Sequence, residues 1–242
     1  MKRFFVNKEI VVNNNLIIDS IEHNHIKNVM RMQVGDEIIL VCGDDFDYYA
    51  TITKMSKGDT QVIVTGKEIN QYNPKNSVTV FQALVKSDNM ALIVQKLTEL
   101  GVTKFVPFES EFITSKDKFG KVNKLQEISN QSVKQCKRSR PMEVTSVMSF
   151  DGMLKSLGDY DLVVFANECE NVKDLSSCDI KSGMKIAIII GSEGGFSPNE
   201  ITKLNGLGVI SVSLGRRILR AETASIALTA VVMNAIGEWR YE

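Results

Sequence analysis

The chain has 242 residues, of which 43% are hydrophobic and 24% are charged, and its formal net charge at pH 7 is zero. This length allows one large domain or two smaller ones, with a core that needs no disulfide staples. The composition is that of an ordinary soluble globular protein. A net charge of zero excludes a uniformly basic nucleic-acid coat protein, so any contact with nucleic acid has to come from local patches.

Signals for membrane insertion, export and metal binding are missing from the sequence. No apolar run approaches the roughly 20 residues that span a bilayer, and the N-terminus MKRFFVNKEI is too polar for a signal peptide. We therefore expect a cytoplasmic protein with no membrane partner. The cysteines form no CxxC pair and have no histidine cluster beside them, so we expect free thiols and no metal site.

Residues 1–72 consist of short apolar segments separated by turn residues, a pattern typical of a small β-barrel. The expected strands are Phe4–Val6, Leu16–Ile18, Glu37–Val41, Tyr48–Thr53 and Gln61–Thr65. One helix is expected over His25–Met32. Its apolar face would carry Ile26, Val29 and Met30. Acidic residues outnumber basic ones in this part of the chain, so charge alone does not predict RNA binding.

A polar segment at residues 70–76 marks the predicted domain boundary, and beyond it strands alternate with helices. This alternation predicts an α/β domain with a mostly parallel sheet. The expected strands are Val78–Leu84, Phe105–Phe108, Leu162–Ala166, Ile186–Ile190 and Val209–Leu214. The expected helices are Met90–Leu100 with Gly101 after its end, Val122–Lys137, one that begins at Pro198 inside a Ser197/Glu200 capping box, and Glu222–Trp239.

The last predicted helix carries two kinds of residue. Its apolar stripe is expected to bury Leu228, Val231, Val232, Ala235 and Trp239. Its first half is rich in alanine, serine and threonine, and such small side chains permit the close approach of another backbone.

Two glycine-containing loops follow predicted strands, Ile190–Pro198 and Leu214–Thr223. The carboxyl ends of parallel strands meet at one edge of a sheet, where α/β proteins bind ligands, so we expect the two loops to form one pocket. Neither loop contains a Walker A or GxGxxG pattern, which argues against a nucleotide-phosphate or dinucleotide site. A plain flexible turn is the alternative interpretation of residues 191–195.

Basic residues are concentrated at two places. Arg216, Arg217 and Arg220 lie in the second loop, and Arg220 comes where a helix is expected to begin, a poor place for a cation because of the helix dipole. An anionic or polar ligand nearby would offset that cost. The segment Lys134–Arg140 is either a solvated helix end or a patch that contacts phosphate, and the sequence leaves both open.

Motifs with a family resemblance occur in this order: RFFV at Arg3–Val6, HxxxVMRxxxGDEI at His25–Ile38, KLTELGV at Lys96–Val102, QCKR at Gln135–Arg138, IGSEGGFS at Ile190–Ser197 and LGRRILRAETA at Leu214–Ala224. With these motifs the chain resembles the 16S ribosomal RNA uracil N3-methyltransferases of the RsmE type, which belong to the SPOUT superfamily. The likeness runs over nearly the whole chain, and the two C-terminal motifs together are highly specific.

The resemblance implies a PUA-like RNA-binding β-barrel at residues 1–72 and a SPOUT methyltransferase domain at residues 74–242, whose mostly parallel sheet is threaded into a trefoil knot. It also implies S-adenosyl-L-methionine as cofactor, a homodimer, and 16S ribosomal RNA or the small ribosomal subunit as partner. The cofactor-binding residues implied by the resemblance are Gly191, Glu193, Gly194, Leu214, Gly215, Ile218 and Leu219. The implied RNA-contacting residues are Arg3, Arg31 and Arg138.

The implied reaction removes the proton from uracil N3 and spreads negative charge over the flanking carbonyl oxygens. Arg220 is the expected stabilising cation, since a guanidinium stays charged at any relevant pH, and the same permanence excludes it as the base. Glu222 and Glu193 are the carboxylates nearest the expected pocket, and each is a candidate base. The alternatives are that Glu222 fixes Arg220 and that Glu193 only shapes its loop.

Several positions depart from the family pattern. Ser192 stands where proline is usual and Phe112 where arginine is usual, which puts the stiffness of the loop and one RNA contact in doubt. Lys134 and Lys137 replace a usual glutamate and glycine. The competing functions are a non-catalytic RNA-binding protein, a nucleotide-dependent enzyme and a SPOUT methyltransferase for another RNA position. The intact LGRRILRAET motif argues against the first, and the missing Walker lysine against the second.

Overall fold

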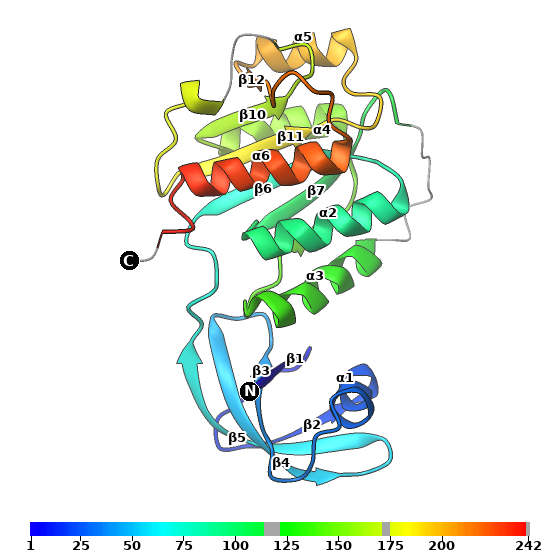
Figure 1. Ribbon diagram of the computed structural model, residues 1–242, viewed down its shortest axis with the longest axis vertical. Coiled ribbons are helices and arrows are strands. Elements are labelled where there is room, and N and C mark those ends of the chain that lie inside the picture. Colours follow the sequence, from blue (N-terminus) through cyan, green and yellow to red (C-terminus); the bar gives the residue numbers. More distant parts are fainter. Residues whose placement is uncertain (114–121, 171–174, 241–242) are drawn as a thin grey trace. The chain divides into compact units, whose positions relative to one another are not determined.

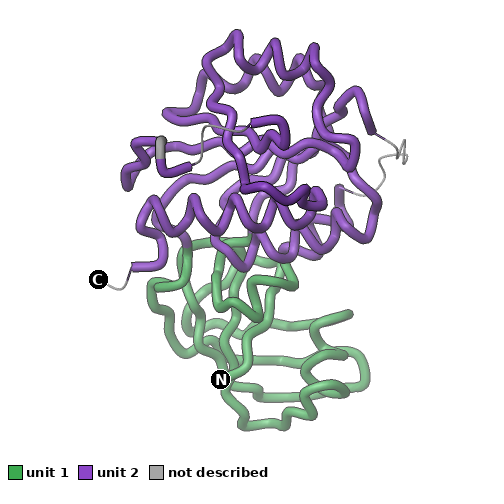
Figure 2. The backbone as a smooth tube through the Cα atoms, turned by 45° about the horizontal axis from the view of Figure 1, so that its top comes forward, with its two compact units in different colours: residues 1–73, 130–141 green, residues 74–129, 142–242 purple. Residues whose placement is uncertain are grey.

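The structure, a computed structural model, describes residues 1–113, 122–170 and 175–240. Its backbone divides into two compact units, which Figure 2 shows in different colours. Unit 1 consists of residues 1–73 and 130–141, and unit 2 consists of residues 74–129 and 142–242. The chain leaves unit 1 beside the polar segment that the sequence marks as a boundary, whereas the return of residues 130–141 to unit 1 has no signal in the sequence pattern.

Unit 1 is built on a five-stranded curled sheet in the order β1-β3-β4-β5-β2 (Figure 1). Its strands are β1 Lys2–Phe5, β2 Asn15–Asp19, β3 Glu37–Val41, β4 Phe46–Met55 and β5 Asp59–Ile69. The β1–β3 pair is parallel and the other pairs are antiparallel. All five predicted strands are therefore present, and the core inside the curl includes Phe4, Ile38, Leu40 and Ile52.

The helical segment of unit 1 differs from its prediction. Helix α1 is Ser20–Asn24, and a π-helical turn continues it over His25–Val29. Only Ile26 of the expected apolar face is buried, whereas Val29 is 61% exposed and Met30 is 37% exposed. The predicted face is wrong because the regular α-helix ends at Asn24 and a π-helical turn follows, so the spacing of an α-helix does not hold over His25–Val29.

Unit 2 contains a seven-stranded sheet in the order β12-β10-β11-β6-β7-β8, with β9 also paired to β7. Its strands are β6 Ser77–Ala83, β7 Lys104–Glu109, β8 Glu143–Val144, β9 Met148–Ser149, β10 Leu162–Ala166, β11 Lys185–Ile190 and β12 Ile210–Val212. Each pairing between these strands is parallel. The predicted α/β class with a mostly parallel sheet is confirmed, although the short strands β8 and β9 lack a sequence signal.

Helices cover both faces of this sheet (Figure 1). They are α2 Ser87–Leu100, α3 Val122–Cys136, α4 Phe150–Ser156, α5 Pro198–Gly206 and α6 Ala221–Ala235, with 3₁₀ turns at Leu157–Asp159 and Leu175–Ser177. One buried cluster joins the sheet to α2 and α6, and a second joins its other face to α4 and α5. None of the helices in the described ranges is both long and apolar enough to cross a bilayer.

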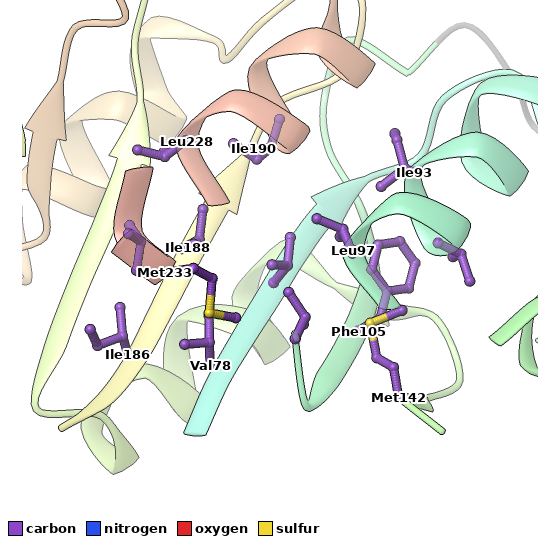
Figure 3. Close-up of a cluster of buried hydrophobic side chains, with 14 of the residues drawn as sticks. Val78, Ile93, Leu97, Phe105, Met142, Ile186, Ile188, Ile190, Leu228 and Met233 are labelled. Atoms are coloured by element: carbon purple, nitrogen blue, oxygen red, sulfur yellow. The ribbon is translucent and has the colours of Figure 1, made fainter. Parts of the chain in front are cut away.

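The central strand β11 is buried on both faces of the sheet. Ile186, Ile188 and Ile190 point into the cluster under α2 and α6, as Figure 3 shows, while Ala187 and Ile189 point into the opposite cluster. A strand buried on both faces reads as a continuous apolar run, which is the pattern of parallel sheets. Because β11 is held on both faces, the loop that follows Ile190 leaves from a fixed point.

Helix ends follow local sequence signals more closely than helix faces do. Gly101 ends α2 with a left-handed φ of 104°, and the Ser197/Glu200 capping box opens α5 with both of its hydrogen bonds formed. The predicted face of α6 is wrong in part, because Val231, Ala235 and Trp239 are exposed. Met233 and Ile236 are buried in their place. The helix also stops at Ala235, before the tryptophan.

Candidate active site

A cavity of about 550 Å³ lies at the carboxyl ends of strands β10, β11 and β12 in unit 2. These three strands are neighbours in the sheet, in the order β12-β10-β11. The loops after all three, together with the N-terminal ends of α2 and α6, supply the lining residues. Its size is that of a pocket for a small organic ligand, and both loops singled out in the sequence contribute to it.

Most of the predicted site residues line this cavity. They are Gly191, Glu193, Leu214, Gly215, Ile218, Leu219, Arg220 and Glu222. Gly194 is not part of the lining, and a Cβ at Gly194 would lie 3.0 Å from Cβ of Phe112. The cavity also contains residues that sequence reasoning missed, namely Lys86, Asn89, Asn167, Glu168 and Cys169. Asn167–Cys169 directly follow the predicted strand Leu162–Ala166, so the strand-end rule applied to that strand would have found them.

The loop after β11 is folded tightly on itself. A Cβ at Gly191 would lie 3.1 Å from the carbonyl carbon of Gly195, which leaves no room for any other residue without a backbone shift. Gly195 has a left-handed φ of 70°, and its N–H donates to the carbonyl oxygen of Ser192 at 3.0 Å. These two glycines are therefore required by packing and by backbone conformation respectively.

Ser192 connects this loop to a distant segment. Its Oγ donates to the carbonyl oxygen of Phe112 at 2.9 Å and accepts from the N–H of Gly194 at 3.3 Å. The Ser192 side chain is almost fully buried, since the residue is only 6% exposed. A hydrogen bond thus holds the loop at the position where the family pattern has a proline.

Glu193 binds the N-terminal end of helix α2. Its Oε1 accepts from the backbone N–H of Lys86, the N-cap residue of α2, at 3.1 Å. A carboxylate at this place satisfies an otherwise free N–H and is favoured by the positive end of the helix dipole. The structure therefore gives Glu193 a role in holding its loop.

The loop after β12 is far more exposed. Arg216 and Arg217 are exposed, and Ile218 is 83% exposed. Gly215 has a left-handed φ of 96°, and its N–H donates to Ser213 Oγ at 3.2 Å. Leu214 packs against the hydrophobic core, but apart from the Gly215 bond, residues 215–219 make no hydrogen bond or ion pair within the described ranges.

Arg220 and Glu222 lie at the start of α6. Arg220 is the N-cap residue, as the sequence predicted, and its carbonyl accepts from Ala224 N at 2.8 Å. Its exposed guanidinium has no ion-pair partner in the part of the chain that the structure describes. Oε2 of Glu222 is buried and, within the same part, has no hydrogen-bond partner. A buried carboxylate oxygen without a donor calls for a proton or a ligand group.

The predicted RNA-contacting arginines differ in accessibility. Arg31 is exposed. Arg3 is held in unit 1 by a bidentate ion pair with Asp47, with Nη2 to Oδ2 at 2.7 Å and only 9% of its side chain exposed. Arg138 is 3% exposed, so it presents almost no surface to RNA as it lies here.

The basic run Lys134–Arg140 is used inside unit 1. Lys134 pairs with Glu22 at 2.7 Å, and both side chains are nearly buried. Arg140 pairs with Asp45 at 3.0 Å, and the Lys137 ammonium lies 5.2 Å from the centre of the Tyr72 ring. These contacts fasten residues 130–141 to the barrel, while Lys137 and Arg140 remain exposed, so contact with phosphate stays a prediction.

The cysteines are all free thiols, Cys42, Cys136, Cys169 and Cys178. Burial and the nearby Asp44 raise the pKa of Cys42 to about 11, so this thiol stays protonated at neutral pH. The described residues contain no group of three or more histidine, cysteine or acidic side chains that could hold a metal ion.

Two family models match the chain. The RNA methyltransferase domain matches residues 71–233, and the RNA methyltransferase PUA domain matches residues 22–65. These matches agree with the α/β sheet of unit 2 and the curled sheet of unit 1, and they confirm the predicted fold class. The trefoil threading of the chain stays a prediction of the resemblance.

Individual relatives and solved structures agree with these models. The chain is 31% identical over 247 residues to Ribosomal RNA small subunit methyltransferase E of Bacillus subtilis, covering 96% of each. It is 30% identical over 236 residues to the Rickettsia conorii protein of the same name, covering 95% of this chain and 94% of that one. A Legionella pneumophila protein solved with the bound cofactor SAM has a TM-score of 0.89 at 27% identity, covering 96% and 97%.

A Neisseria gonorrhoeae Ribosomal RNA small subunit methyltransferase E, bound to S-adenosyl methionine, has the same fold, with a TM-score of 0.89 at 24% identity and 98% of each chain covered. The first of the two family models spans most of this chain, including the whole cavity wall. The chain belongs to the RNA methyltransferase family.

Proposed function

We propose that this protein transfers a methyl group from S-adenosyl-L-methionine to N3 of a uridine in 16S ribosomal RNA. The observation that carries the proposal is that the loops after β11 and β12 line the same cavity, with Arg220 and Glu222 in its wall. The names of the bacterial relatives support the small-subunit RNA as substrate, and the Legionella pneumophila protein supports the cofactor. The choice of uracil N3 rests on the family resemblance of the motifs.

The residues of the cavity fit this cofactor. S-adenosyl-L-methionine carries a positive sulfonium and a positive ammonium group but no phosphate, and the wall supplies the carboxylates of Glu168, Glu193 and Glu222 in place of a phosphate-binding loop. We propose that Gly191, Glu193, Gly194, Leu214, Gly215, Ile218 and Leu219 hold it. The glycines that line the cavity let the adenine approach main-chain groups closely. Gly194 does not line the cavity and contributes by allowing the conformation of the loop.

The proton on uracil N3 has to leave before N3 is a useful nucleophile. We assign its removal to Glu222, because Glu193 is already bonded to the N-terminal end of α2, whereas Oε2 of Glu222 is buried and has no hydrogen-bond partner among the described residues. The Arg220 guanidinium, which pairs with no carboxylate of the described residues, stabilises the charge that develops on the uracil oxygens. The bound cofactor supplies the methyl group, and the walls orient it toward N3.

RNA binding is assigned mainly to exposed cations. Arg31 is accessible as the structure stands. Arg3 and Arg138 are buried, so we propose that they shape the binding surface of unit 1 rather than form its outer face. The substrate is present in the cytoplasm, where ribosomal subunits assemble, and this is the proposed location of the protein.

We also propose a homodimer. Helix α6 presents an outer side with Thr223, small alanines and Val231, which is 49% exposed. Small side chains let a second backbone approach closely, and a second copy would cover this side and the exposed Ile218 of the cavity loop. A monomeric mass in sedimentation equilibrium at micromolar concentration would contradict the dimer.

The test of the proposed function is loss of methylation in Arg220→Ala. We expect this variant to lose methylation of 16S ribosomal RNA, measured by mass mapping of its nucleosides, while the affinity for S-adenosyl-L-methionine changes by no more than about tenfold, or about 1.4 kcal/mol. Arg216→Ala is the matched control, because Arg216 is an exposed arginine of the same loop that does not line the cavity. Wild-type turnover by Arg220→Ala would remove Arg220 from the mechanism.

The alternative of a non-catalytic RNA-binding protein is tested by calorimetric titration of the wild-type protein with S-adenosyl-L-methionine. Binding together with a new N3-methyluridine in RNA from a deletion strain supplied with the protein supports the enzyme. RNA binding without any cofactor binding would support the alternative.

A further inference from the structure

Phe112 is an unusual phenylalanine in this chain. Phe4, Phe81, Phe105, Phe108 and Phe165 are each almost fully buried, whereas 43% of Phe112 is exposed and it belongs to none of the buried hydrophobic clusters. Leaving a large apolar ring in water costs free energy that burial would recover. An exposed aromatic ring beside a ligand cavity therefore calls for a partner.

The backbone around this ring is held in place by buried groups. Ser110 Oγ donates to Glu200 Oε2 at 3.2 Å, and the N–H of Glu111 donates to Oε1 of the same carboxylate at 3.0 Å. Glu200 is only 4% exposed and also closes the capping box of α5. The segment that carries Phe112 is thus anchored on both oxygens of a buried carboxylate.

The ring is also joined to the cofactor loop. The carbonyl oxygen of Phe112 accepts from Ser192 Oγ at 2.9 Å. A Cβ at Gly194 would lie 3.0 Å from Cβ of Phe112 and 3.7 Å from its Cγ, so the base of the ring lies directly on this glycine. Glu193 and Gly195, on either side of Gly194, line the cavity. Phe112 is not itself a lining residue, but it packs against the loop that lines the cavity, so we place it at the rim, with 43% of its surface exposed.

The substrate provides the chemistry that such a ring would bind. N3 of uracil lies on the edge that forms base pairs, so the target base has to be unpaired and unstacked before it reaches the cavity. Unstacked RNA bases are commonly held by stacking on aromatic side chains, because every base has a π-face. A ring whose backbone is fixed loses little conformational freedom when a base stacks on it.

We propose that Phe112 is a stacking platform for a nucleobase of the RNA substrate at the rim of the cofactor cavity, and that Ser192 holds this platform to the cofactor loop. The inference rests on the proposed function, since it takes RNA as the substrate. It joins the two departures from the family pattern, Ser192 and Phe112, into one device. Where the family pattern has an arginine, this chain has an aromatic ring, which can stack on the face of a base but cannot bind a phosphate.

The first experiment compares Phe112→Leu with wild type in steady-state methylation of small ribosomal subunits. Leucine keeps the apolar contact with Gly194 but removes the π-face. We expect the KM for RNA to rise about tenfold, while kcat and the Kd for S-adenosyl-L-methionine stay within about twofold. Leu207→Ala is the control, since Leu207 is an apolar residue 57% exposed elsewhere in unit 2, and it should leave every parameter unchanged. An unchanged KM in Phe112→Leu overturns the inference.

The second experiment detects the stack directly. Trp239 is the only tryptophan, so Phe112→Trp in a Trp239→Phe background reports from the rim alone. We expect its fluorescence to be quenched when a single-stranded RNA spanning the methylated nucleotide is added, and to be unaffected by S-adenosyl-L-methionine. RNA binding without quenching overturns the inference. Failure of the wild-type protein to methylate uracil N3 would instead overturn the proposed function, even where quenching shows that the ring meets a base.

Discussion

The two loops that close the cavity are held in different ways. The loop after β11 is held by three hydrogen bonds. Ser192 bonds to Phe112, Glu193 to the N-terminal end of α2, and Gly195 to Ser192 within the loop. The loop after β12 carries exposed Arg216 and Arg217 and an isoleucine with 83% of its surface in contact with solvent. The loop after β11 is therefore held in place by hydrogen bonds to the rest of the protein, whereas the loop after β12 has few such bonds.

This difference assigns separate tasks to the two loops. Preorganised groups cost little entropy when a ligand arrives, so the loop after β11 is suited to fix the cofactor. Loosely held segments with few buried contacts are the ones that adapt to partners. The loop after β12 is accordingly suited to meet RNA or a second copy of the chain, and Arg220 comes at the point where it joins the rigid helix α6.

Among the substitutions that test this difference between the loops, Gly191→Ala should have the largest effect. The added Cβ would lie 3.1 Å from the backbone of Gly195, and backbone cannot swing aside as a flexible side chain can. We expect overpacking to cost about 1–3 kcal/mol of folding stability, with a loss of S-adenosyl-L-methionine affinity of more than about tenfold. Thermal unfolding and calorimetric titration measure the two effects.

The matched control is Gly215→Ala in the other loop. Gly215 has a left-handed φ of 96°, but a Cβ there meets nothing within 4 Å. The only expected cost is the backbone strain of alanine in this conformation, about 1–2 kcal/mol, which the loosely held loop can relieve by shifting. A larger loss of affinity in Gly215→Ala than in Gly191→Ala would mean that the ranking of the two loops is wrong.

Glu193 offers a smaller and more selective change. Glu193→Gln keeps an oxygen for the N–H of Lys86 but removes the charge at the end of α2, so we expect a loss of about 0.3–1 kcal/mol in the free energy of unfolding. Glu193→Ala removes the hydrogen bond as well, and should cost about 1 kcal/mol more. Urea denaturation measures both.

The same pair of variants separates holding from proton transfer. At saturating S-adenosyl-L-methionine, methylation by Glu193→Gln should stay within about threefold of wild type, because the proposed base is Glu222. Loss of turnover in Glu193→Gln with its stability preserved would show instead that Glu193 takes the proton, and Glu222 would then be left with the task of fixing Arg220.

The sequence predicted these features unequally, for physical reasons. Gly101, the Ser197 capping box and the N-cap position of Arg220 are local, because a few neighbouring residues determine each of them. The bond from Ser192 to Phe112 depends on which strands become neighbours, and a contact across 80 residues leaves no local pattern. Val231 was expected to be buried because helical periodicity finds an apolar stripe without telling which side faces the core.

The charges of the chain show the same limit. Arg138 and Lys134 read in the sequence as part of a basic patch, because sequence spacing cannot show that residues 130–141 return to unit 1. Lys134 pairs with Glu22, 112 positions away, and Arg138 is buried. Arg216 and Arg217, which are equally basic in the sequence, are exposed. Tertiary contacts, rather than composition, decide which cations are available to RNA.

Arg217→Ala is expected to have the smallest effect on folding stability, and it tests whether the loop after β12 binds RNA. An exposed side chain in a loosely held loop contributes little to folding, so the free energy of unfolding should change by less than about 0.5 kcal/mol. Binding of RNA should nevertheless weaken at low salt, and the slope of log affinity against log salt should fall by about one if Arg217 meets a phosphate. Salt titrations of RNA binding by fluorescence anisotropy measure this slope.

Lys134→Ala is the control, since the Lys134 ammonium is already paired with Glu22. This variant should destabilise unit 1 and leave the salt slope unchanged. If Arg217→Ala instead destabilises the protein and leaves the salt slope of RNA binding unchanged, Arg217 holds the loop after β12 in place. The assignment of the loop after β11 to the cofactor and of the loop after β12 to RNA or a second copy would then be wrong.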